Sequence, residues 1–177
     1  QEKTDILEIA KEYISEEKGV ATVDEAISGA LDIIAEIISD DAGFRKKIKS
    51  LCFREAVLSS KASKEEKSAY DMYYEYQEGI LKIPSHRILA INRGEKEEFL
   101  KVKVDKPEEK ILDYLNKQII KDYKSQYNEI LTNCILDSFK RLIEPSIERE
   151  IRSDLTERSE EQAIKVFGKN AKQLLMQ

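Results

Sequence analysis

Side chains suited to nucleophilic or acid–base catalysis are few in this chain. Its 177 residues include one histidine, His86, so a catalytic base would have to be that residue or a carboxylate. Ser85 precedes it, but adjacent residues at a helix start do not face each other, which argues against a serine–histidine pair. Acidic pairs carry little signal in a chain that is 37% charged, and the sequence has no Gly-rich phosphate loop. We therefore expect no enzymatic activity and no cofactor.

Metal-ligating residues are equally sparse. Cys52 and Cys134 stand alone, without the paired spacing of a zinc site or of a disulfide framework. A single histidine excludes a histidine cluster. We expect no metal, and we expect both thiols to be buried and reduced in a cytoplasmic protein.

Basic side chains offer a different chemistry, the binding of phosphate. One group lies at 45–49, and a second lies in the alternating segment 99–104. Residues 1–43 hold 12 acidic and 3 basic side chains, whereas the rest of the chain is net positive by four. These cations are candidates for nucleic-acid backbone contacts, and the alternative is that they form a solvated face. The candidates from these two groups are Arg45, Lys46, Lys47, Lys49, Lys101 and Lys103.

Tyrosines at 70, 73 and 74 share one face of a predicted helix that a capping box at 63–66 would open. Such a face can stack single-stranded bases, but amphipathic tyrosines more often line the edge of a core. With no basic residue interleaved among them, we favour the core.

The elements that must position these residues are mostly helical. Spacing of three and four residues predicts helices, and period-two alternation predicts strands. Two strands, 56–60 and 99–104, predict a short two-stranded antiparallel ribbon. The predicted helices are 2–15, 22–38, one beginning at 39–41, 63–79, 83–94, 107–144, 146–158 and 159–177, with the long segment 107–144 breaking near 125–128.

The fold class we predict is mainly α, an elongated multi-helix bundle with the ribbon at its side. Elongation follows because a straight helix over 107–144 would be about 55 Å long, against a radius of gyration near ~16 Å for a compact chain of this size. No apolar run approaches the ~20 residues that a membrane span needs. The net charge of −5 gives no general attraction to nucleic acid or to anionic membranes.

Three strings together resemble the N-terminal region of the bacterial Tex transcription accessory proteins. The first runs from Glu17-Lys18-Gly19-Val20 through the 26–42 helix pair. The second contains Pro84-Ser85-His86-Arg87 and Asn92-Arg93-Gly94-Glu95, and the third runs from 142 to 167. They are in the family's order and cover nearly the whole chain, so we expect 1–177 to be one Tex-type helical region.

This resemblance implies a transcription role linked to RNA or DNA, with a helix-turn-helix that we expect in the 2–38 pair. It also implies that the family's nuclease-like, helix-hairpin-helix and OB-fold domains lie outside this region and carry the main nucleic-acid contacts. Arg87 and Arg93, in the matching strings, would either pair with carboxylates or face phosphate, and Gly94 would take a left-handed turn. The resemblance implies that this region is part of a longer Tex-like protein. The expected partners are RNA or DNA, bound through that longer protein, together with its remaining domains and the transcription machinery.

Two functional hypotheses remain open. In the first, the basic part after residue 43 contacts a nucleic-acid backbone. In the second, the helices are purely a protein–protein scaffold without direct nucleic-acid contact. Steep salt dependence of binding would distinguish the first from the second.

Overall fold

The computed structural model describes residues 22–64, 66–121 and 127–176. The chain divides into two compact units, one of residues 1–45 and 112–144 and the other of residues 46–111 and 145–177. The described chain is mainly helical with one small antiparallel sheet. The predicted helix at 2–15, and with it the first half of the expected helix-turn-helix, lies outside the described residues.

The first unit is built on α2 (Val23–Asp40), which packs against α6 (Asn128–Asp137) and the π-helical segment η3 (Ser138–Ile143). The predicted capping box at Thr22 is confirmed: the Glu25 amide donates to the Thr22 hydroxyl, and the Thr22 amide donates to the Glu25 carboxylate. The buried Ser138 hydroxyl donates to the Ala35 carbonyl at 2.6 Å, so this core satisfies its polar group internally.

The long segment 107–144 breaks as predicted, between Ile119 and Asn128, and residues 122–126 within this interval lie outside the described residues. It forms α5 (Glu108–Ile119), then α6 and η3. The next boundary was predicted wrongly. A single helix, α7 (Glu144–Leu175), replaces the two helices expected at 146–158 and 159–177. Ser159 does not interrupt it, because its buried hydroxyl donates at 2.6 Å to the Leu155 carbonyl one turn earlier.

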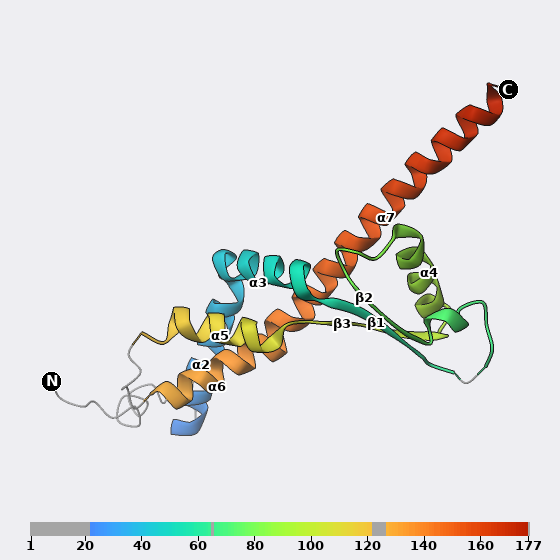
Figure 1. Ribbon diagram of the computed structural model, residues 1–177. Helices are drawn as coiled ribbons and strands as arrows, with labels where there is room; N and C mark the ends of the chain where they lie inside the picture. The colour runs from blue at the N-terminus through green and yellow to red at the C-terminus, as the bar shows by residue number, and fades with distance from the viewer. Residues whose placement is uncertain (1–21, 65, 122–126, 177) are drawn as a thin grey trace. The chain divides into compact units, whose positions relative to one another are not determined.

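The sheet of the second unit has three strands instead of the predicted two. The order is β2-β1-β3, with β1 (Val57–Ala62) antiparallel to both β2 (Glu75–Gly79) and β3 (Leu100–Asp105) (Figure 1). The predicted pairing of the two original strands is confirmed, with Ser60 opposite Val102.

The additional strand comes from the segment predicted as the tyrosine helix. There the chain forms a short 3₁₀ turn, η2 (Asp71–Tyr73), and then β2. The Ser60 hydroxyl donates to the Tyr73 carbonyl at 2.6 Å, and the Tyr73 and Tyr76 rings pack edge to face at 5.4 Å. Pairing with β1 and burial of Tyr73 therefore outweigh the local helical pattern. Tyr70 and Tyr73 are buried, which leaves them no free face for stacking a base.

Helix α4 (Ser85–Lys96) follows the sheet's second strand and contacts β3, while α3 (Ala42–Glu55) leads into β1. Gly94 does not take the predicted left-handed turn. It lies inside α4, where an added Cβ would come within 2.7 Å of the Leu100 side chain. The chain turns instead at Glu98, which has a φ of 61°.

Within this unit α7 has two parts. One face of its first part is buried, and this face carries Ile147, Ile151, Leu155 and Ser159. Its second part extends past α4 and the sheet, and residues 160–170 are all exposed (Figure 1).

Candidate nucleic-acid interface

Helix α3 carries the densest group of cations in the chain. Its residues from 42 to 54 include five basic side chains and no acidic one. Asp41, just before it, accepts a hydrogen bond from the Phe44 amide at 2.7 Å and so caps the helix start. Ile48, Leu51 and Cys52 are buried, which fixes the opposite side of the helix toward solvent.

The outward side of α3 is a continuous basic face. At 3.6 residues per turn, positions 46, 47, 50 and 54 fall in a sector of about 100°. All four are exposed, and Lys46, Lys47 and Arg54 have no ion-pair partner among the described residues. The neighbouring Glu55 is engaged by Lys110 at 2.6 Å. We call Lys46, Lys47, Ser50 and Arg54 the α3 basic face.

Lys49, on the same helix, has a structural role instead. Its ammonium lies 2.8 Å from Asp154 and 3.6 Å from Glu150, both on α7. The hydrogen bond to Asp154 raises the pKa of Lys49 against the opposing effect of burial. This side chain ties α3 to α7 and is not available to phosphate.

Arg45 is also turned away from the basic face. Its guanidinium donates to the Ser39 carbonyl in the last turn of α2 at 3.3 Å. The predicted group at 45–49 therefore contributes two residues, Lys46 and Lys47, to the exposed face.

The two arginines in the α4 strings pair with carboxylates. Arg87 lies 3.1 Å from Glu78 and stands over the Tyr76 ring at 5.7 Å. Arg93 lies 2.9 Å from Glu97, which also accepts a hydrogen bond from the Tyr70 hydroxyl. The bond from Arg93, followed by that from Tyr70, lowers the pKa of Glu97. Of the two alternatives for Arg87 and Arg93, the structure has the carboxylate pairing.

Lys101 and Lys103 lie on the exposed side of β3. The sheet register sets Lys61 of β1 directly opposite Lys101, with Glu75 of β2 on the other side of Lys61. Lys103 lies 3.2 Å from Asp105. This face mixes both signs of charge, so it attracts phosphate less than the α3 basic face does.

Sequence reasoning missed Arg54 and Lys61. Arg54 follows Lys46 by eight residues and Lys47 by seven, so continuing the helical spacing would have found it. Lys61 is one residue past the predicted strand end, and only the strand register brings it beside Lys101.

A polar network joins α4 to α7 and accounts for two residues of the Asn92-Arg93-Gly94-Glu95 string. Arg152 of α7 donates to the Glu95 carboxylate at 2.9 Å through one nitrogen and to the Asn92 amide oxygen at 3.2 Å through another. The Asn92 amide nitrogen donates to Thr156 at 2.8 Å. These groups bind one another across the two helices, so few of their hydrogen-bond donors and acceptors are left to bind a ligand.

His86 is exposed at the start of α4, and the hydroxyl of the preceding Ser85 donates to the Gln162 side chain. The same residues contain no group of three or more histidine, cysteine, aspartate or glutamate side chains arranged to hold a metal ion. No helix in the described parts combines the length and apolar character needed to cross a membrane.

Comparison with known proteins supplies a context for this geometry. Residues 1–167 match the family described as "Tex central region-like". An uncharacterized protein of Bacillus subtilis, YdcI, is 52% identical over 172 residues, which are 95% of this chain and 24% of that protein.

More distant relatives include the human S1 RNA-binding domain-containing protein 1, 31% identical over 90% of this chain and 18% of its own length. The transcriptional accessory protein Tex of Neisseria gonorrhoeae is 28% identical over 99% of this chain and 24% of its own length. The chain thus spans about a quarter or less of each of these relatives.

Proposed function

The chain belongs to the Tex central region-like family, and from that premise we propose that it is the helical scaffold of a transcription accessory protein and contacts nucleic-acid phosphates through the α3 basic face. Relatives named for transcription accessory function and for an S1 RNA-binding domain support the transcription role and the link to RNA. We propose a cytoplasmic location and RNA or DNA as the ligand of the whole protein.

One observation carries the phosphate contact: α3 presents three exposed cations in one sector with no acid among them. From Lys46 to Arg54 they extend about 12 Å along the helix axis. Lys49 and its two carboxylates hold this helix against α7, so the cations project from a fixed element. A rigid row of cations suits a phosphate backbone and reads no base sequence.

The helix-turn-helix that the resemblance implies belongs to the proposal as an accessory element. Its second helix would be α2, whose exposed side includes Asp24, Glu36 and Asp40. Because these carboxylates repel phosphate, we assign the backbone contact to α3 and not to α2. The proposal includes no catalytic step.

The test is a titration of the chain with a single-stranded RNA and a duplex DNA oligonucleotide at two salt concentrations. The variant K46A/K47A/R54A should weaken binding and flatten the dependence of log K on log salt, by about 2 for the single-stranded RNA and by about 3 for the duplex DNA, because three phosphate contacts are removed. The matched control, K103A/K117A/K140A, removes the same charge from lysines that pair with carboxylates of this chain, and it should change the slope little.

A purely protein–protein scaffold is the second candidate. It is supported by the pairing of Lys49, Arg87, Arg93 and Lys103 with carboxylates of this same chain. Equal salt slopes for wild type and the α3 variant, or negligible binding at physiological salt, would favour this candidate over the first.

A further inference from the structure

An apolar groove lies between the segment that enters α4 and the second part of α7. Its volume is about 730 Å³. Leu81, Ile83 and Leu89 line one side, and Val166 and Phe167 line the other. Ile83 is buried, but the Phe167 side chain is 74% exposed, so the α7 wall of the groove is open to solvent.

Polar contacts fix both walls. The Ser85 hydroxyl donates to the Gln162 side-chain oxygen at 2.5 Å, joining the α4 start to α7. Arg158 of α7 donates to the Ile80 and Ile83 carbonyls at 3.4 and 3.5 Å, which links the same two walls a second time. A groove whose walls are already ordered binds a ligand with little further loss of entropy.

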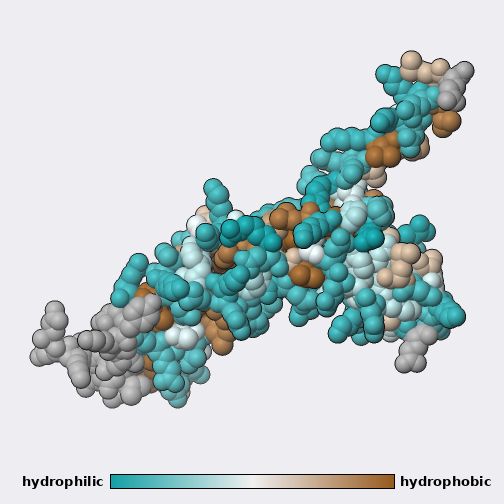
Figure 2. Space-filling view, viewed as in Figure 1, coloured by the Kyte–Doolittle hydropathy of each residue, from teal (hydrophilic) through white to brown (hydrophobic). Residues whose placement is uncertain are grey.

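The apolar surface continues beyond the groove along α7. Ile164 is 71% exposed, and Leu174 and Leu175 are exposed as well. With Phe167 and Ala171 they follow the three- and four-residue spacing of one helix face. Figure 2 shows brown apolar patches on this part of the helix among teal hydrophilic residues. Such a stripe is what an amphipathic helix packs against.

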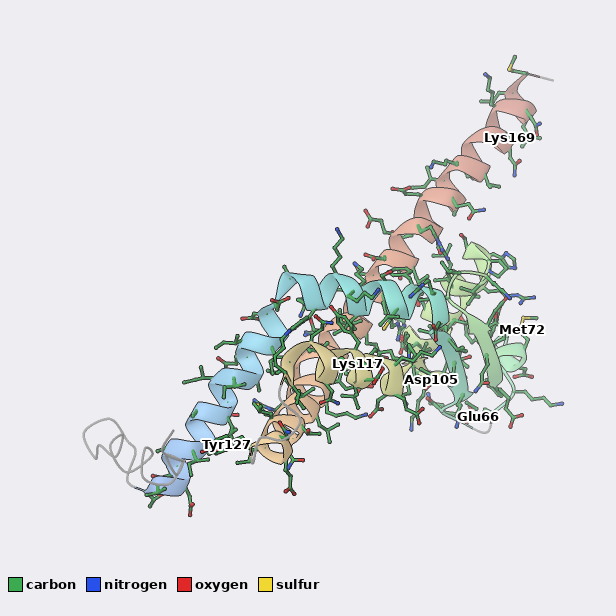
Figure 3. The ribbon with its side chains drawn as sticks, turned by 60° about the vertical axis from the view of Figure 1, so that its left-hand side comes forward. Glu66, Met72, Asp105, Lys117, Tyr127 and Lys169 are labelled. Atoms are coloured by element: carbon green, nitrogen blue, oxygen red, sulfur yellow. The ribbon has the colours of Figure 1, made fainter. Side chains whose placement is uncertain are left out.

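Charge restricts the kind of helix. Residues 162–176 contain three lysines, at 165, 169 and 172, and no acidic residue, although Lys165 lies 3.8 Å from Glu161 one turn earlier. Figure 3 shows the Lys169 side chain on this far part of α7. The groove lining itself contains Arg158 and no carboxylate. A partner that matches both features carries apolar side chains in a stripe and carboxylates beside it.

We propose that this groove and the adjoining α7 face dock an acidic amphipathic helix from a partner protein. The large side chains of that helix would fill the space between Leu81 and Phe167 and cover Ile164. Its carboxylates would lie beside Lys169 and Lys172. The surface is separate from the α3 basic face, so the two proposals can fail independently.

The test uses the whole chain and a synthetic acidic peptide of about 20 residues with leucine at heptad positions a and d and glutamate at most others. Binding is measured by calorimetry or by fluorescence anisotropy. Phe167→Glu should weaken binding about tenfold or more, because it removes a large apolar contact and adds a like charge. Met72→Glu is the matched control, since Met72 is 73% exposed in η2, and it should leave binding unchanged.

A second experiment varies the charge of the chain and of the peptide. It distinguishes the proposed docking from nonspecific binding to an apolar surface. Lys169→Glu should weaken binding of the acidic peptide and strengthen binding of the same peptide with lysine in place of glutamate. Circular dichroism should show unchanged helix content for each variant, because the substituted side chains are exposed. Variants of the α3 basic face should bind the acidic peptide as the wild type does.

Three results would overturn the proposal. The first is equal binding of the acidic and lysine peptides by the wild-type chain. The second is binding of vesicles containing phosphatidylserine that depends on Phe167 while the acidic peptide does not bind, which would make the stripe a lipid contact. The third is a dimer in sedimentation velocity that Phe167→Glu disrupts in the absence of peptide binding, which would make the occupant a second copy.

Discussion

Individual cations in this chain have different roles because of the acids that lie beside them. Lys49 and Lys46 are three residues apart on one helix, yet Lys49 reaches Asp154, while Lys46 is exposed and has no ion pair within the described ranges. Arg93 is similarly occupied by Glu97. A paired cation would have to give up its carboxylate before binding phosphate, so the exposed and unpaired ones are the stronger candidates.

Gly94 shows the same dependence on neighbours in packing terms. Within α4 an alanine would normally stabilise the helix by up to about 1 kcal/mol relative to glycine. Here its Cβ would lie 2.7 Å from a Leu100 methyl carbon and 3.0 Å from the Tyr70 ring. We expect Gly94→Ala to lower the free energy of unfolding by about 1–3 kcal/mol through overpacking, as measured by thermal or urea unfolding.

Gly29→Ala is the matched control for Gly94→Ala. Gly29 also lies inside a helix, α2, but nothing comes within 4 Å of its added Cβ. This variant should be neutral or more stable by about 0.5–1 kcal/mol. If both substitutions stabilised the chain alike, close packing at Gly94 would not be the reason for its glycine.

At the scale of elements, α7 combines two environments in one helix. Its first part is held by an apolar face at four-residue spacing and by polar bonds to α4. Its second part keeps helical geometry with its apolar stripe in water. Isolated helices of this length are marginal in water, so the second part depends on the first for its nucleation.

The bond between α4 and α7 gives the second prediction. Arg152→Ala would leave the partly buried Glu95 and Asn92 without their donor. We expect the free energy of unfolding to fall by about 1–3 kcal/mol, measured by urea unfolding. Arg149→Ala is the control on the same helix, because Arg149 is exposed and donates only to the Pro145 carbonyl of its own turn. It should change stability by less than about 0.5 kcal/mol.

Elements with strong local signals could be predicted from the sequence. The α2 start follows from its capping box, and β3 follows from alternation of apolar and basic residues. Segment 75–79 could not be predicted, because its strand form depends on pairing with β1, which lies far away in the sequence. The helix boundary predicted at 158–159 was also wrong, because the Ser159 hydroxyl bonds to the Leu155 carbonyl within one continuous helix.

The exposure and pairing of the candidate cations were predictable in the same partial way. Basic composition named Lys46 and Lys47 as candidates, but it could not separate them from Lys49, whose partners Glu150 and Asp154 are about a hundred residues away in the chain. For Arg87 the deciding neighbour is Glu78 on β2, which lies in the segment predicted as a helix. Long-range pairing of charges therefore limited the site prediction.

At the scale of the whole molecule, the net charge of −5 conceals an uneven distribution. The net negative charge of the molecule repels the phosphates of a nucleic acid. We therefore expect one local basic face to give only weak binding. The matched relatives are about four or more times longer than this chain. If α3 contacts phosphate as proposed, further contacts in the longer proteins should add to its contribution.

This inference gives the third prediction. The chain and the full-length Bacillus subtilis relative should be titrated in parallel with the same RNA at two salt concentrations. The longer protein should bind more tightly and show a steeper salt dependence, because it neutralises more phosphates. Equal affinities and slopes would mean that this region alone accounts for binding.

One side-chain contact also affects how molecules of this protein behave toward one another. Strand β3 is at the sheet edge, where a free amide can recruit a strand from another molecule. The Val104 amide instead donates to Glu148 at 3.1 Å, and the same carboxylate holds the ammonium of Lys106, whose side chain is 2% exposed. A charged pair anchored on α7 thus occupies the place that an incoming strand would need. The contact should therefore hinder the pairing of β3 with a strand of another molecule, and with it edge-to-edge aggregation.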